Sequence, residues 1–172
     1  MSLAVGEMPT ITFDLTGLYT EPTDTTADTA TYSAQATPVL FKQGNTVASS
    51  FAGYDGAAIQ SFSVDMANEV TARELVGTDK SVILTNRAPS GEAVIETPTI
   101  AAKNFFQQAT SDTLGLVSLQ HGVTAGNIVS VLCPTVDITN PSYSESDGIS
   151  MLNIPFTPVP SAGNDEMKLT FS

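Results

Sequence analysis

The chain has 172 residues, of which 18 are acidic and 6 are basic, so its formal net charge is −12. Because binding to nucleic-acid phosphates relies on Lys and Arg, this charge argues against a nucleic-acid-binding protein. A single cysteine, Cys133, excludes an internal disulfide framework and is expected to be buried in its apolar run, and no run of about 18 apolar residues is present to cross a membrane.

The first predicted elements are a strand and a long polar arm. Apolar and polar residues alternate over residues 10–19, which indicates a strand whose buried face carries Ile11, Phe13 and Leu15. Residues 21–36 are rich in Thr, Asp and Ala and have almost no large apolar side chain. We therefore expect an arm or loop there.

A second long connection is predicted shortly afterwards. Residues 38–42 indicate a short strand, and residues 43–55 read as a loop in which Phe51 and Tyr54 are exposed. Long polar connections in a small domain are usually functional or become ordered on a partner. We therefore expect residues 20–57 to be poorly ordered in the free chain.

The longest strand pattern covers residues 58–70. Phe62, Val64 and Met66 share one face of this strand and are expected to be buried. Ile59 lies out of phase with them, which indicates a β-bulge near the start of the strand.

Two more strands are predicted before the middle of the chain. Residues 72–79 indicate a turn, and the apolar run at residues 82–84 indicates a strand that is covered on both faces. Residues 87–91 indicate a turn around Pro89, and residues 92–96 then alternate as a further strand.

One amphipathic helix is predicted over residues 97–109. Thr97 is a suitable N-cap, and Pro98 fits the first helical position, where its missing N–H has no intrahelical partner to lose. Phe105 and Phe106 lie on the apolar face of the helix. The opposite face carries Lys103, Gln107 and Gln108.

Closely spaced strands follow the helix. They are expected at residues 114–120, 127–133, 135–139, 148–157 and 166–171. Pro134 predicts a bend or a sheet edge between two of them, and Glu166 is expected on the outer face of the last one. Together the elements predict a mainly β fold. It would be a β-sandwich or flattened barrel with one flanking α-helix at about residues 98–109, forming a single domain over residues 1–172.

The sequence offers little support for an enzyme or a metal site. A nucleophile–His–acid set would have to use the only histidine, His121, which we expect to be exposed at a strand end beside Gly122. Asp65 and Glu69, like the oxygen-rich residues 144–147, lack the full pattern of a calcium loop. We expect no catalysis, no cofactor and no metal.

The scarce arginines are more informative. Arg73 and Arg87 flank the predicted strand at residues 82–84. Both are candidates for ion pairs with acidic residues, either within the chain or between subunits. Of these two interpretations, an intrachain pair is favoured.

Several stretches resemble the tail tube proteins of long-tailed bacteriophages and related prophages. They are residues 61–70 (SFSVDMANEV), 73–77 (RELVG), 96–99 (ETPT), 114–126 and 147–166. The resemblance covers residues 57–172 well and the preceding residues loosely. It implies a β-sandwich with one flanking helix, whose copies stack as rings into a hollow tube through which DNA passes.

The same resemblance implies a structural virion protein of the phage tail, present in the host cytoplasm during assembly. Its partners would be copies of itself and other tail proteins, with no membrane and no specific nucleic-acid binding. Proteins of this group are often longer than this chain, which leaves open a missing N-terminal part. The candidates for contact between subunits are Phe51, Tyr54, Arg73, Arg87, Lys103, Gln107 and Gln108.

Two alternatives stay open at this point. One is a non-catalytic β-sandwich binding module of adhesin or carbohydrate-binding type on a virion. Clustered exposed aromatic residues would favour it, but the tyrosines are scattered in sequence at Tyr19, Tyr32, Tyr54 and Tyr143. The other is a hydrolase, which the single histidine makes weak.

Overall fold

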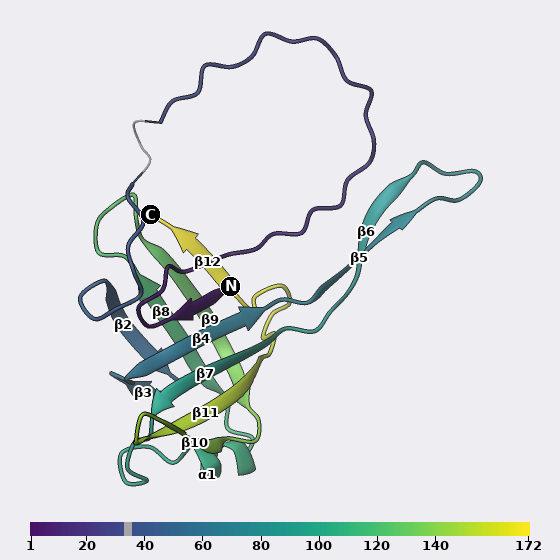
Figure 1. The fold of residues 1–172 in the computed structure, drawn as a ribbon. Coiled ribbons are helices and arrows are strands. Elements are labelled where there is room, and N and C mark those ends of the chain that lie inside the picture. Colours follow the sequence, from purple (N-terminus) through teal and green to yellow (C-terminus); the bar gives the residue numbers. More distant parts are fainter. Residues whose placement is uncertain (33–35) are drawn as a thin grey trace.

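The computed structural model describes residues 1–32 and 36–172 and confirms the mainly β fold (Figure 1). The strands and the helix of the described residues are β1 (Ser2–Ala4), β2 (Thr46–Phe51), β3 (Tyr54–Asp55), β4 (Ile59–Asp65), β5 (Asn68–Arg73), β6 (Ser81–Arg87), β7 (Ser90–Glu96), α1 (Phe105–Thr110), β8 (Gly115–His121), β9 (Val129–Ile138), β10 (Ser142–Ser146), β11 (Ile149–Pro158) and β12 (Lys168–Phe171). No helix among them is long and apolar enough to span a bilayer.

The body of the molecule is one antiparallel sheet that folds over to enclose a core, as in a β-sandwich. The strand order is β1-β4-β7-β11-β9-β8-β2-β3, with β10 paired to β11 and β12 paired to β9. Strands β5 and β6 form a separate two-stranded sheet that projects away from this body (Figure 1).

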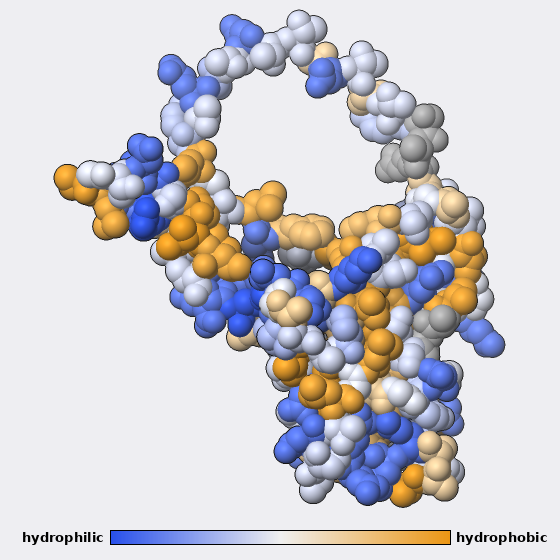
Figure 2. Space-filling view, turned by 180° about the vertical axis from the view of Figure 1, so that it is seen from behind, coloured by the Kyte–Doolittle hydropathy of each residue, from blue (hydrophilic) through white to orange (hydrophobic). Residues whose placement is uncertain are grey.

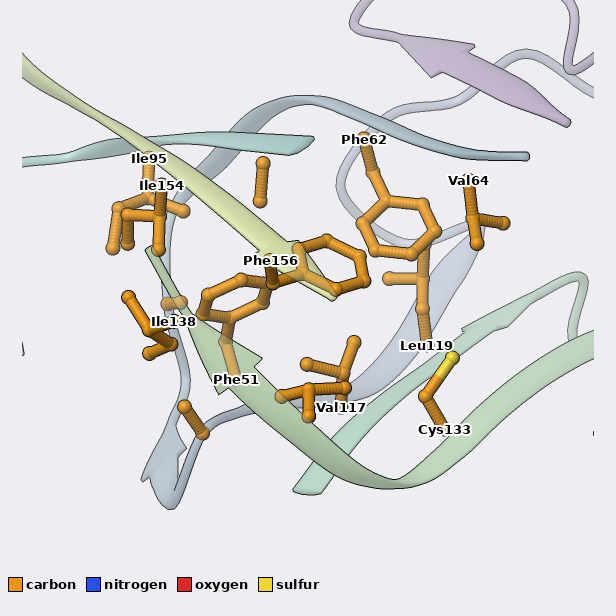
Figure 3. Close-up of a cluster of buried hydrophobic side chains, with 14 of the residues drawn as sticks. Phe51, Phe62, Val64, Ile95, Val117, Leu119, Cys133, Ile138, Ile154 and Phe156 are labelled. Carbon is orange, nitrogen blue, oxygen red and sulfur yellow. The ribbon is translucent and has the colours of Figure 1, made fainter. Parts of the chain in front are cut away.

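Aromatic rings from three distant segments fill the core. The Phe156 ring lies 5.8 Å from the Phe62 ring and 5.6 Å from the Phe51 ring, centroid to centroid (Figure 3). The prediction that Phe51 is exposed is therefore wrong. Residues 43–55, expected as a loop, instead form the β2–β3 hairpin, which carries Phe51 inward.

Alternation predicted the central strands correctly. Phe62 and Val64 on β4 are buried, as are Ala93 and Ile95 on β7. The register between these two strands shifts between Ile59 and Ser61, so the predicted bulge is confirmed.

The first predicted strand is not formed. Thr10 exchanges two backbone hydrogen bonds with Ser2, but residues 11–32 form no strand and pass through an extended, exposed arm (Figure 1). The strand expected at residues 38–42 is also wrong, although Phe41 is buried and exchanges backbone hydrogen bonds with the segment at residues 6–7. Residues 33–35 of the predicted arm lie outside the described residues, and the predicted poor order of the free chain stays a prediction.

The single strand expected over residues 58–70 is divided into β4 and β5. Ala67 has a φ of 45°, in the left-handed region, and its N–H donates to the Asp65 Oδ1 at 2.9 Å. This Asx-type turn ends the ladder of the body and redirects the chain. The strand at residues 82–84 is not covered on both faces, because it belongs to the projecting β5–β6 sheet.

The helix is shorter than predicted and begins at Phe105. Asn104 is its N-cap, and the Asn104 Oδ1 accepts a hydrogen bond from the Gln107 N–H at 2.9 Å. Thr97 does not cap the helix, because its N–H donates to the Ser150 carbonyl and its hydroxyl lies 3.0 Å from the Ser150 hydroxyl. These contacts hold Thr97 against β11.

Two strands separated by Pro134 were expected here, but Pro134 lies within one continuous strand, β9. The strand changes partner there: residues 129–132 pair with β12 and residues 136–138 pair with β11. Proline has no N–H to give to a ladder, so a position between two partners suits it. Strand β10, which was not among the strands expected from the sequence, pairs along its length with β11.

Candidate assembly surfaces

An exposed apolar surface lies on the β5–β6 sheet, which we call the ribbon (residues 68–87). Val70 pairs with Leu84 and Ala72 pairs with Val82, so these four side chains share one face. Val70 is 44% exposed and Leu84 is 53% exposed. Figure 2 shows the apolar residues of the ribbon projecting beyond the body.

The ribbon is not supported by the rest of the chain. Within the described residues, no helix or strand other than β6 packs along β5. The tip of the ribbon carries Leu75 and Val76, both exposed, and an exposed ion pair in which the Lys80 Nζ lies 2.7 Å from the Glu74 Oε1. Since isolated two-stranded sheets are only marginally stable in water, the ribbon needs further contacts.

The base of the ribbon is anchored by a buried ion pair. The Arg87 Nη2 donates to the Glu166 Oε1 at 2.6 Å and to the Asn164 Oδ1 at 3.0 Å. This confirms the favoured intrachain pair for Arg87 and corrects the outward placement of Glu166, which is buried. Arg73, at the other end of β5, is exposed and forms no ion pair among the described residues.

A groove of about 830 Å³ lies at the opposite end of the body from the ribbon. Its apolar lining includes Val5, Ile59, Ile149 and Met151. Strand β4 begins at this groove and leads into the ribbon, whereas β7 leaves the ribbon and ends at the groove, where Glu96 lines it. The ribbon and the groove therefore lie at opposite ends of the same pair of strands, β4 and β7.

The outer face of β4 and β7 is acidic. Asp65, Glu92 and Glu96 are exposed there, opposite the core side chains of the same strands, and Ser63 pairs with Glu92. The outward positions of β4, β7 and β11 carry no Lys or Arg among the described residues. This face would repel a polyanion.

Three interface candidates, Lys103, Gln107 and Gln108, lie in or beside helix α1. Two of them, Lys103 and Gln108, form contacts within the chain. The Lys103 Nζ donates to the Ala52 carbonyl at 2.6 Å and lies 5.6 Å from the centre of the Phe105 ring, and burial lowers the pKa of Lys103. Gln108 is buried and its Nε2 donates to the Thr113 carbonyl, which corrects its outward prediction. Gln107 remains exposed.

Two other side chains also hold the chain together. Tyr54 is half-buried, and its ring meets the Phe105 ring edge-on at 6.2 Å. His121 is buried, so the expected exposed histidine is wrong: its Nε2 lies 3.1 Å from the Val39 carbonyl, and its Nδ1 lies 3.5 Å from the Thr46 hydroxyl. His121 thus fastens the end of the arm to the body.

Comparison with known proteins identifies the family. A family model of phage tail tube proteins matches residues 1–158. The chain belongs to the phage tail tube protein family. It is therefore a structural subunit of a phage-type tail tube, located in the tail of a virion, and the tube is built from copies of the subunit.

The chain is also similar to a solved structure described as the tail of an empty GTA particle computed with helical refinement, C6 symmetry. The two are 15% identical with a TM-score of 0.44, over 76% of this chain and 98% of that chain. A search of curated proteins gave no match.

Sequence reasoning missed the ribbon of this tail tube protein. A signal was present, because residues 70–72 (VTA) and the apolar run at residues 82–84 flank a turn around Gly77. Their pairing could have been inferred as a hairpin. Their exposure could not have been inferred, because a strand covered within its own chain and a strand covered by another molecule have the same composition.

Proposed function

We propose that copies of this tail tube protein stack as rings into a hollow conduit for DNA, with the ribbon as the contact between successive rings. The observation that carries this proposal is a two-stranded ribbon that projects from the body with its apolar face exposed. A monomeric protein rarely leaves such a surface uncovered.

The partner of the ribbon tip in this proposal is the groove of another copy. The tip offers Leu75 and Val76, and the groove offers Ile59 and Ile149. Because the tip and the groove lie at opposite ends of the β4–β7 pair, the contact is head-to-tail and repeats from copy to copy. Arg73 and Gln107, both exposed, remain candidates for contacts between subunits.

In the same proposal, the acidic outer face of β4 and β7 lines the conduit. Asp65, Glu92 and Glu96 would keep the DNA backbone from adhering while it passes. The subunit then needs no catalysis and no specific nucleic-acid contact. Other tail proteins bind the ends of the tube, and assembly takes place in the host cytoplasm.

Negative-stain microscopy and sedimentation of the full chain test the stacking. We expect rings or tubes with a central hole at high concentration, and their loss in the variant Leu75→Ser/Val76→Ser. Both side chains are exposed in the single chain, Val76 fully so, and the monomer should therefore keep its stability within about 0.5 kcal/mol.

The matched control is Val123→Ser, which removes an exposed apolar side chain away from the ribbon and the groove. It should assemble as the wild type does. A wild-type chain that stays monomeric at every concentration, and binds a glycan in array screening, would overturn the proposal in favour of a carbohydrate-binding module.

A further inference from the structure

We propose that the start of the arm, residues 11–16, adds as a third strand to the free edge of β5 in a second copy of the chain. This inference rests on the proposed function, because it requires copies to lie side by side or one above another. It concerns the shaft of the ribbon, whereas the groove receives the tip.

The arm has the sequence of a strand but lacks a sheet. Ile11, Phe13 and Leu15 alternate with polar residues, and Phe13 is 67% exposed and Leu15 is 93% exposed. The last backbone pairing before this stretch is the Ser2–Thr10 bridge. Alternation of this kind favours a half-buried strand, but residues 11–16 pair with no strand of the described chain.

The ribbon has a strand edge that is suited to pair with such a segment. Strand β5 pairs with β6 on one side, and its other edge is unpaired in the described residues. An edge of this kind is a template for pairing with an extended segment. A third strand would also bring the ribbon to the number of strands at which a small sheet becomes stable.

The side chains agree with this pairing in either strand direction. If Phe13 lies beside Ala72, then Ile11 in a parallel pair, or Leu15 in an antiparallel pair, lies beside Val70. The apolar side of the arm then extends the apolar face of the ribbon. Asp14 falls on the opposite face, which is the face of Arg73.

Charge favours the same partner. Residues 10–32 carry four acidic residues and no Lys or Arg: Asp14, Glu21, Asp24 and Asp28. Arg73 has no ion-pair partner among the described residues of its own chain. Where the arm leaves the body, Asp14 shares a hollow with Asp65 and Glu92, and no Lys or Arg lines it. Asp14 thus lies among like charges where the arm starts, whereas Arg73 offers it an opposite charge on the ribbon shaft.

The structure also favours a second copy over the same chain. Pairing within one chain carries no loss of translational freedom, so an accessible ribbon edge in the same chain would be taken by the free monomer. Instead, the arm curves away from the ribbon of its own chain (Figure 1). The partner edge that remains is that of another copy.

Cross-linking between copies tests the pairing directly. Full chains carrying Thr12→Cys are mixed with full chains carrying Thr71→Cys, assembled and treated with a short bis-maleimide. We expect a cross-linked dimer in assembled material, because Thr12 and Thr71 lie on the same face in both strand directions. The buried Cys133 does not compete. The control mixture replaces Thr12→Cys by Thr26→Cys, further along the arm, and should give no such dimer.

Substitution tests the energetics. Phe13→Ser/Leu15→Ser should raise the concentration needed for assembly by about tenfold or more, since two large apolar side chains lose their burial. Tyr32→Ser, an exposed aromatic in the same arm, is the control and should not change it. Asp14→Arg and Arg73→Asp should each raise that concentration by about two- to fivefold, and the double variant should restore it.

The outcomes separate this inference from the proposed function. Tubes that form equally well from Phe13→Ser/Leu15→Ser, with no Thr12–Thr71 cross-link between copies, would overturn the strand addition and leave stacking intact. A cross-link that forms only within single chains of a Thr12→Cys/Thr71→Cys variant would also overturn it. Wild-type chains that form neither rings nor tubes would overturn both.

Discussion

The guanidinium of Arg87 and the carboxylate of Glu166 lie 2.6 Å apart and join the base of the ribbon to the segment that precedes the last strand. Arg87 is the final residue of β6, and Glu166 comes 79 positions later in the chain. Glu166 is nearly inaccessible to solvent. The pair therefore sets where the ribbon leaves the body.

Glu166→Gln should destabilise the chain by about 1.5–3 kcal/mol, because it leaves the Arg87 guanidinium partly buried without its counter-charge. Urea unfolding followed by circular dichroism measures the loss. Glu74→Gln is the matched control, since it removes the exposed ion pair with Lys80 and should change stability by less than about 1 kcal/mol. Equal losses in the two variants would contradict the anchoring role.

A second prediction concerns Gly91, which lies on β7 against the Phe156 ring. A Cβ at this position would meet three ring atoms of Phe156, with the Cε2 at 2.6 Å. Gly91→Ala should therefore destabilise the chain by about 1–3 kcal/mol through overpacking. Phe156→Leu should recover part of the loss when combined with it, because the smaller side chain leaves room for the methyl group.

The control for this prediction is Gly17→Ala, where no atom lies within 4 Å of the added Cβ and the backbone φ is not positive. It should be neutral within about 0.5 kcal/mol. If Gly91→Ala were as well tolerated as Gly17→Ala in thermal unfolding, the close approach of β7 to Phe156 would be disproved.

Cys133 should be unreactive in the folded chain. Burial raises the pKa of its thiol from an ordinary 9.0 to about 11. Well below pH 9 the thiol is protonated in both states and stability is unaffected. As pH rises from 9 towards 11, the unfolded chain releases a proton that the folded chain retains, so the free energy of unfolding falls.

Two measurements check this behaviour. Labelling with a thiol reagent at pH 8 should require unfolding, and denaturant midpoints should decline between pH 9 and pH 11. In Cys133→Ala the decline should be shallower, because the remaining lysines and tyrosines are common to both chains. Rapid labelling of native protein would show that the core around Cys133 opens readily.

The acidic outer face predicts that tubes do not retain DNA. Reversing one charge in every copy with Glu92→Lys should raise the affinity of tubes for short duplex DNA by about tenfold or more at low salt, and added salt should reverse the effect. Glu21→Lys makes the same change in net charge on the arm. Equal DNA retention by both variants in co-sedimentation would exclude a special role for the face of β4 and β7.

The strands of the body were predicted correctly from the sequence where the pattern depends only on residues close together in the chain. Phe62 and Val64, like Ala93 and Ile95, alternate because each strand has one face on the core, and a period of two reports that directly. Ile59 broke this period, and the break marked a real bulge. These strands need no information from elsewhere in the chain.

The predictions from the sequence were wrong where a residue far away in the chain determines the local structure. Thr97 and Asn104 are both suitable N-caps, but Thr97 is hydrogen-bonded to Ser150 and therefore does not cap the helix. His121 is buried because Val39 and Phe41 return to cover it. The alternation at residues 11–16 indicates a strand, but a strand needs a partner edge, and we propose that another molecule supplies it.

One consequence follows from the placement of the tip and the groove at opposite ends of β4 and β7. In the proposed stacking such a contact is directional, so a finished tube would have two chemically different ends. One end would display unoccupied ribbons and the other would display unoccupied grooves. A protein that starts the tube and a protein that stops it would then meet different surfaces, and the subunit itself would encode which end is which.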